Sequence, residues 1–158
     1  MSTDDRFTDE HWMGLALTAA TQAEHEGDVP VGCVIVHPRD GLIATEYNRR
    51  EVSQDPTAHA EVLALRAASA KLGRWRLSDC TVYVTLEPCF MCAGALVNAR
   101  VGRVVYAAVD PKAGACESLA RVLEDGRLNH RCEVSRGPLQ EQAKTQLQDF
   151  FRARRTKS

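Results

Sequence analysis

The stretch TVYVTLEPCFMC, residues 81–92, contains a strand, a break and the start of a helix. Its first six residues are rich in β-branched and aromatic side chains, which favour a central strand. Glu87-Pro88 ends that strand, and proline suits the first turn of the helix predicted over Cys89–Ala99. Gly102 ends the helix, and a second strand is predicted over Arg103–Ala108. This order of strand, helix and strand favours parallel strands with helices packed on the sheet.

The flanking sequence extends the same pattern in both directions. Upstream, we predict a helix over Asp9–Glu26, a hairpin of strands over Val31–Val36 and Leu42–Tyr47, a polar loop over 48–56, and a helix over Ala58–Lys71 capped by Thr57. Downstream, we predict a short helix around 118–124, a strand around 131–135 and a last helix over Leu139–Arg154. The expected fold is α/β, a three-layer α/β/α sandwich with a mixed sheet of about five strands, in a single domain over residues 1–158.

Composition and charge narrow the class of protein. The chain has 158 residues, 44% of them hydrophobic and 26% charged, an ordinary globular balance. The N-terminus lacks the apolar segment of a signal peptide, and no apolar run approaches membrane-spanning length, so we expect a cytoplasmic protein without a membrane partner. The formal net charge is -1, yet residues 150–158 carry four cations and no anion. This basic end is interpreted as a phosphate-binding surface or as a helix end that complements its own dipole.

The six cysteines are expected to stay reduced in the cytoplasm, which leaves metal binding and core packing as their roles. Cys33, Cys80 and Cys132 lie in or beside predicted strands and are interpreted as structural, whereas Cys116 in a loop stays open. The histidines also divide: we predict surface positions for His11, His25 and His37, and a structural hydrogen bond for His130.

Two short motifs carry the chemistry, and each lies where a helix is predicted to begin. Cys89 and Cys92 are three residues apart and face the same way on a helix, whose N-terminus favours thiolates. His59 at the start of the other helix supplies a third ligand. Three protein ligands leave one position of a tetrahedral Zn²⁺ site for water, as in catalytic sites. Glu61, two residues after His59, is predicted to move the protons of that water.

A lone Cys-x-x-Cys pair has other uses, namely redox chemistry or half of a zinc ribbon. The sequence has no second Cys-x-x-Cys and no His-x-x-x-His to complete a ribbon. A redox site does not require His59-Ala60-Glu61 either. The residues therefore favour a hydrolytic deaminase over a structural zinc module.

The sequence resembles the bacterial tRNA-specific adenosine deaminases over nearly its whole length. The resemblance rests on DPTAHAE at 55–61, TLEPCFMCAGA at 85–95, and the shorter matches VPVG at 29–32, NHR at 129–131 and FFRARR at 150–155. It implies a cytidine-deaminase-like fold, a homodimer and one Zn²⁺ per subunit held by His59, Cys89 and Cys92. It also implies that Glu61 is the proton shuttle and that wobble adenosine of a tRNA anticodon stem-loop is the substrate.

The resemblance further implies substrate contacts for Asn48, Asp110, Phe151 and Arg152. Val109 and Glu117 depart from the family pattern, because a basic residue and a glycine are usual at those two positions. Both departures flank the loop expected to face RNA. The alternatives that stay open are a deaminase of a free base or nucleotide, such as guanine or cytosine, and a non-catalytic zinc module.

Overall fold

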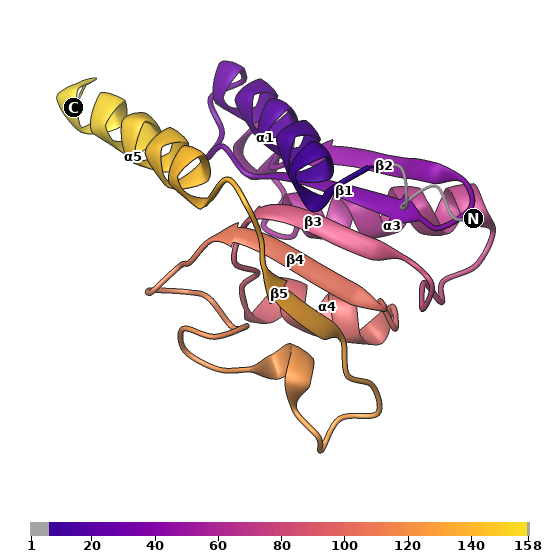
Figure 1. The fold of residues 1–158 in the computed structure, drawn as a ribbon. Coiled ribbons are helices and arrows are strands. Elements are labelled where there is room, and N and C mark those ends of the chain that lie inside the picture. Colours follow the sequence, from indigo (N-terminus) through magenta and orange to yellow (C-terminus); the bar gives the residue numbers. More distant parts are fainter. Residues whose placement is uncertain (1–6, 158) are drawn as a thin grey trace.

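In the computed structural model, which describes residues 7–157 and the side chains of 7–155, five strands form one mixed sheet in the order β2-β1-β3-β4-β5 (Figure 1). The strands are β1 (Gly32–His37), β2 (Gly41–Tyr47), β3 (Thr81–Leu86), β4 (Arg103–Ala108) and β5 (Glu133–Arg136). β1 pairs antiparallel with both β2 and β3, whereas β3, β4 and β5 are parallel to one another. The predicted mixed sheet is confirmed.

Helices cover both faces of the sheet, which gives the predicted three layers (Figure 1). They are α1 (Asp9–His25), α2 (Arg50–Ser53), α3 (Ala60–Leu72), α4 (Phe90–Asn98), the 3₁₀ helix η2 (Val122–Glu124) and α5 (Gln140–Lys157). Successive strand side chains point to opposite faces. On β3, Val82 and Val84 join the core that contains α3 and α4, while Tyr83 joins the core that contains α1 and α5.

The bounds of β3 and β4 and the start of α1 match the prediction residue for residue, but the starts of α3, α4 and α5 do not. Thr57 does not cap α3, because its hydroxyl and amide both bond to the Asp55 carboxylate; His59 is the N-cap residue instead. A short helix, α2, interrupts the predicted polar loop. The helix predicted around 118–124 is reduced to η2, because the amide and hydroxyl of Ser118 bond to Glu87.

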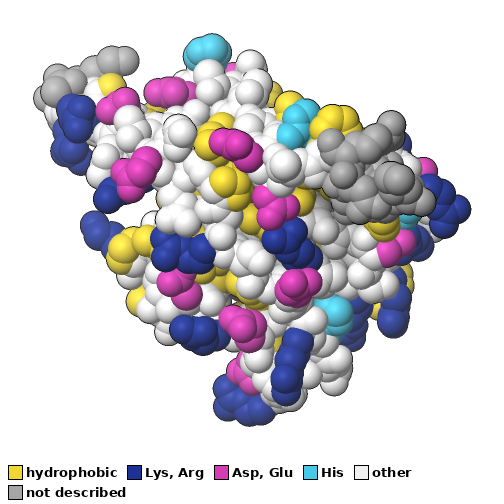
Figure 2. All heavy atoms as spheres, viewed as in Figure 1, with side chains coloured by type: hydrophobic (Ala, Val, Ile, Leu, Met, Phe, Trp, Pro, Cys, Tyr) yellow, Lys and Arg dark blue, Asp and Glu magenta, His cyan; other side chains and the backbone are white. Residues whose placement is uncertain are grey.

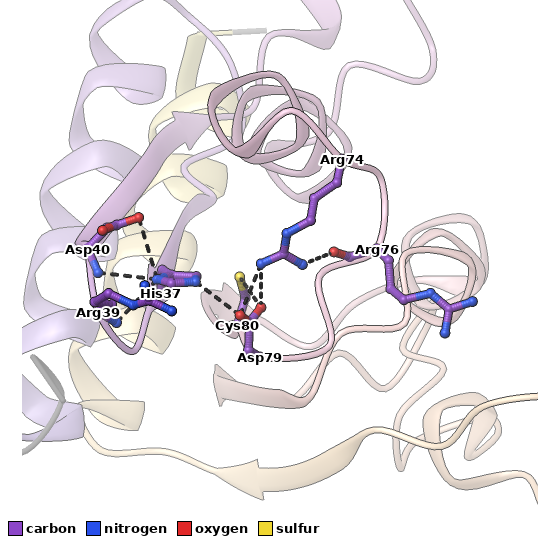
Figure 3. A network of polar contacts seen from close by, with 7 residues as sticks. All are labelled: His37, Arg39, Asp40, Arg74, Arg76, Asp79 and Cys80. Atoms are coloured by element: carbon purple, nitrogen blue, oxygen red, sulfur yellow. Dashed lines mark hydrogen bonds and ion pairs between the residues drawn. The ribbon is translucent and has the colours of Figure 1, made fainter. Parts of the chain in front are cut away.

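His37 is buried, so its predicted surface position is wrong. Its Nδ1 accepts the backbone amides of Arg39 and Asp40, both at 3.2 Å, and its Nε2 lies 3.0 Å from Oδ2 of Asp79 (Figure 3). Arg74 donates to both oxygens of Asp79 at 3.0 Å. This network ties the β1–β2 turn to the start of β3. His37, at the end of β1, bonds to three polar groups at once.

The predicted positions of the other histidines and of the core cysteines hold. His11 and His25 are exposed, and Cys33, Cys80 and Cys132 are buried. Cys116, which the sequence left open, is buried as well. Nε2 of His130 lies 2.7 Å from the carbonyl oxygen of Val101, the structural hydrogen bond expected for it.

Candidate metal centre and adjoining groove

The fold brings the predicted motifs to one edge of the sheet. The carboxyl ends of β3 and β4 meet there, and the antiparallel hairpin adds the start of β1 and the end of β2. A cavity of about 200 Å³ lies at this edge, the usual place for a ligand in an open α/β sheet. Its wall comes from each of these segments and from the starts of α3 and α4: Val29, Val31, Asn48, Arg50, His59, Ala60, Glu61, Leu86, Glu87, Cys89, Asp110 and Ala113.

His59 and Cys89 line this cavity, and the buried Cys92 lies beside them. Nδ1 of His59 lies 3.6 Å from Sγ of Cys89 and 3.5 Å from Sγ of Cys92, and the three ligand atoms all lie within 4.8 Å of one another. A tetrahedral zinc ion with ordinary bond lengths separates such nitrogen and sulfur ligands by about 3.6 Å. The three side chains are therefore placed and spaced to bind Zn²⁺.

The electrostatics of the centre also suit a metal. Hydrogen bonds to the Cys89 sulfur lower the pKa of Cys89 to about 4. The larger effect comes from the Cys92 thiol and the smaller from the ring of His59. Glu61 is 4% exposed, and this burial raises the pKa of its carboxyl group to about 7. Burying a carboxyl group costs free energy, and buried groups with a shifted pKa cluster at functional sites.

Asn48 lies in the cavity wall, where the resemblance places it. Its Nδ2 donates to the carbonyl oxygen of Val29 at 3.3 Å, and its Oδ1 accepts the amide of Arg50 at 3.2 Å. These two bonds fix the plane of the side-chain amide. The second N–H of the amide can still donate to a ligand.

Glu87 also lines the cavity, although the sequence indicated only that Glu87-Pro88 ends a strand. It is 2% exposed. Burial alone raises its pKa, but hydrogen bonds from Ser118 and from the amides of Asp110 and Glu117 outweigh burial and lower the pKa to about 2. Its donors lie 23 to 31 residues further along the chain, so no local pattern in the sequence points to them.

A groove of about 710 Å³ continues the cavity toward α5, and the two share Val29, Leu86 and Asp110. Figure 2 shows Lys and Arg side chains gathered around the hollow next to α5. The wall of the groove holds four cations and one anion, together with apolar side chains: Lys112, Lys144, Arg152, Arg155, Asp110, Val29, Leu86, Val109, Leu147 and Phe151. The structure therefore brings Asp110, Phe151 and Arg152 together in one surface.

The sequence did not single out Lys112 and Lys144 as part of this surface. Lys144 lies three, seven and eleven residues before Leu147, Phe151 and Arg155, a helical spacing that puts them on one face of α5. That periodicity was the signal available for Lys144. The exposed fraction of Phe151 is 44%, and Arg152 pairs loosely with Asp149 at 3.3 Å.

Arg154 belongs to the basic end but not to the groove. Its guanidinium donates to the carbonyl oxygen of Gly27 and lies 4.7 Å from the centre of the Phe150 ring. It therefore fastens α5 to the end of α1. The basic end therefore has two roles: Arg152 and Arg155 line the groove, whereas Arg154 holds α5 in place. The side chain of Lys157 lies outside the described residues.

The sequence model of the cytidine and deoxycytidylate deaminase zinc-binding region matches residues 6–108, which include all three metal-binding side chains. The chain belongs to this family of zinc-binding deaminases. A tRNA-specific adenosine deaminase of Bacillus subtilis (strain 168) is 46% identical over 149 residues, covering 94% of this chain and 92% of the relative. The deaminase is thus similar to that relative well beyond the zinc-binding region.

Solved structures agree with the family assignment. A structure from a study of A-to-I editing by tRNA:A34 deaminases at the wobble position has a TM-score of 0.82 and 42% identity, covering 87% of this chain and 99% of that chain. A guanine deaminase from Nitrosomonas europaea has a TM-score of 0.76 and 28% identity, covering 90% of this chain and 84% of that chain. The predicted cytidine-deaminase-like fold is confirmed.

The metal ligands can be tested by substitution. Cys89→Ala and His59→Ala are each expected to lose zinc and stability together, because metal binding is coupled to folding. Cys33→Ala is the matched control: its thiol is buried in the core, and the change is expected to keep zinc and to cost about 1 kcal/mol. Elemental analysis and denaturant unfolding measure both effects. Full zinc occupancy in Cys89→Ala contradicts the ligand assignment.

Proposed function

We propose that this deaminase converts adenosine to inosine at the wobble position of a tRNA anticodon loop. The observation that carries this proposal is the continuity of two spaces: the zinc-binding cavity opens into the basic groove along α5. The cavity admits one base, and the groove offers cations to the phosphates on either side of it. Anticodon loops are single-stranded, so one of their bases enters such a cavity at low unstacking cost.

In the proposed reaction His59, Cys89 and Cys92 hold the metal, and Glu61 moves the protons. Zinc held there supplies the Lewis acidity that makes a water molecule nucleophilic near neutral pH. Glu61 takes a proton from the attacking water and gives it to N1 of adenine while the C6–O bond forms. Glu61 then carries the remaining proton of the new C6 hydroxyl to the exocyclic amine, the C6–N bond breaks, and ammonia leaves. Adenosine and water thus give inosine and ammonia.

Four residues are proposed to hold the substrate. Asn48 donates its second amide N–H to the nucleoside from the cavity wall. Asp110 lies where the cavity meets the groove and therefore contacts the backbone beside the flipped nucleotide. Phe151 offers an exposed ring on which a neighbouring base can stack, and Arg152 pairs with a phosphate.

Guanine is the alternative substrate that one observation favours, namely the structural likeness to a guanine deaminase. The groove argues against it, because a free base needs no row of cations outside the cavity. The cytoplasm is the proposed location. The six cysteines are free, and none of the helices in the described residues is long and apolar enough to cross a membrane.

A second copy of the chain is the proposed partner besides RNA. Apolar side chains are exposed beside α3 and α4: Trp75, in the loop after α3, is 58% exposed, and Phe90, at the start of α4, is 53% exposed. A groove of about 560 Å³ lies between α3 and α4 and is lined by Val62, Leu65, Arg66, Ser69, Trp75, Ala95, Asn98 and Ala99. A homodimer covers this surface.

The homodimer can be tested by sedimentation velocity. The wild-type protein is expected to sediment as a dimer, and Trp75→Glu is expected to dissociate it. A monomeric wild-type protein contradicts the proposed homodimer.

The substrate can be decided by measuring ammonia release. The zinc-loaded protein is expected to release ammonia from an anticodon stem-loop with adenosine at position 34. Free guanine, cytosine and cytidine are expected to give none. Release from guanine alone supports the free-base alternative, and release from none of the four supports a non-catalytic zinc module.

Glu61→Ala is expected to keep zinc and the fold while turnover falls by about 10²- to 10⁴-fold, because a positioned acid–base group contributes that much. Single-turnover assays on the stem-loop measure the loss, and elemental analysis checks the metal. The proton-shuttle role is wrong if this variant retains activity close to that of the wild type.

The groove can be tested by the salt dependence of binding. In the double variant Arg152→Ala and Arg155→Ala, the slope of log affinity against log salt is expected to flatten by about 0.7 for each phosphate that the protein no longer neutralises. Arg154→Ala is the matched control, because its guanidinium bonds to Gly27 and not to the groove. It is expected to lower stability and leave the slope unchanged. An unchanged slope in the folded double variant rules out this end of α5 as the RNA-binding surface.

A further inference from the structure

Residues 110–118 (the 110–118 loop), part of the segment that joins β4 to η2, fold around the carboxylate of Glu87. One oxygen, Oε1, accepts the amide of Asp110 at 2.9 Å and the hydroxyl of Ser118 at 2.5 Å. The other, Oε2, accepts the amides of Cys116, Glu117 and Ser118 at 3.0, 2.8 and 2.9 Å. Five donors from both ends of the loop thus converge on one buried side chain.

The loop also lies directly against the segment that carries the first cysteine ligand. The amide of Ala115 donates to the carbonyl oxygen of Pro88 at 2.9 Å, and Gly114 forms an isolated antiparallel bridge with Cys89. A Cβ atom at Gly114 would overlap the carboxyl group of Glu87, so only glycine allows the backbone to come this close. Glu87 therefore sets the distance between the loop and the metal centre.

The inner end of the loop forms part of the substrate space. Asp110 and Ala113 line the cavity, and Asp110 and Lys112 line the groove. The Asp110 carboxylate also accepts the amides of Lys112 and Ala113, both at 3.2 Å, which closes a tight turn. Where this turn lies depends on the bond from its first amide to Glu87.

The outer end of the loop is held by Glu117, one of the two departures from the family pattern. Its carboxylate accepts the hydroxyl of Tyr106 and lies 3.3 Å from Nε of Arg136. Tyr106 is on β4 and Arg136 is on β5, so this contact ties the loop to the sheet. Glu117 supports the loop from a part of the molecule that does not line the cavity or the groove.

We propose that Glu87 is a positioning residue that fixes the 110–118 loop as one wall of the substrate space and thereby sets the affinity for RNA. This inference rests on the proposed function, because RNA is the ligand that touches both cavity and groove. The expected consequence is specific. Loosening the loop weakens contacts that substrate and transition state share, which raises KM and leaves kcat nearly unchanged.

Glu87→Gln tests the proposal with little change in volume. The glutamine amide group turns N–H donors toward donors of the loop, so at least some of the five hydrogen bonds cannot form. KM for the adenosine stem-loop is expected to rise about 10- to 100-fold, the usual cost of removing a group that orients a site. The value of kcat is expected to stay within about threefold of the wild type, with unchanged zinc content. Glu141→Gln makes the same change at an exposed position and is expected to leave KM unaltered.

A second variant and a binding measurement separate positioning from a merely structural role. Ser118→Ala removes one donor and keeps the three backbone amides at Oε2, so KM is expected to rise about 3- to 10-fold in a folded protein. The same substitutions combined with Glu61→Ala allow the affinity for unreacted stem-loop to be measured by fluorescence anisotropy. That affinity is expected to fall in parallel with the rise in KM.

Three outcomes overturn the proposal. In the first, Glu87→Gln folds, retains zinc and keeps the wild-type KM. In the second, kcat and zinc content fall together at an unchanged KM, which assigns Glu87 to the metal centre instead. In the third, Glu87→Gln fails to fold and Ser118→Ala leaves KM unchanged. A wild-type protein without activity on the stem-loop contradicts the proposed function. This result is distinct from the three outcomes above, all of which require an active wild-type protein.

Discussion

The meeting of two helix N-termini at one edge of the sheet is the constraint on which the rest of the site depends. His59 and Cys89 are the N-cap residues of α3 and α4, and both have the extended backbone of such residues. An N-cap side chain usually bonds to the first amides of its helix. Neither His59 nor Cys89 does so, which leaves both side chains for a metal. The helix dipoles in turn favour the negative charge of thiolates at this place.

The layers of the fold keep the two helix starts in register. Buried small and apolar residues fasten both helices to the same face of the sheet, among them Ala60 and Ala64 on α3 and Ala93 and Leu96 on α4. A metal site needs its ligands held within a fraction of an ångström. The core between each helix and the sheet provides that rigidity. On the opposite face, α5 extends past this edge of the sheet and supplies one wall of the groove.

What the sequence could predict follows from how far each interaction reaches along the chain. Strands β3 and β4 and the pair Cys89 and Cys92 depend on near neighbours, and these predictions hold. Glu87 bonds only to donors more than twenty residues away, and His37 bonds to the distant Asp79 as well as to two nearby amides, so no local pattern reveals these long-range bonds. Arg154 has the same limit: its charge is evident in the sequence, but its bond to Gly27, 127 residues away, is made only by the fold. The cysteine pair was therefore predictable from local sequence, whereas the long-range bonds of Glu87, His37 and Arg154 were not.

The distribution of charge resolves how a chain of net charge -1 can hold a polyanion. Cations line the groove, whereas the cavity holds the carboxylates of Glu61 and Glu87, with Asp110 at the junction. Arg50 is the one Lys or Arg side chain in the wall of the cavity among the described residues, and it is exposed. Phosphates are thus attracted to the groove and repelled from the inner cavity, which a neutral base can enter. In the proposed function, the same separation lets the buried carboxylates serve proton transfer and loop positioning without weakening the contacts to RNA.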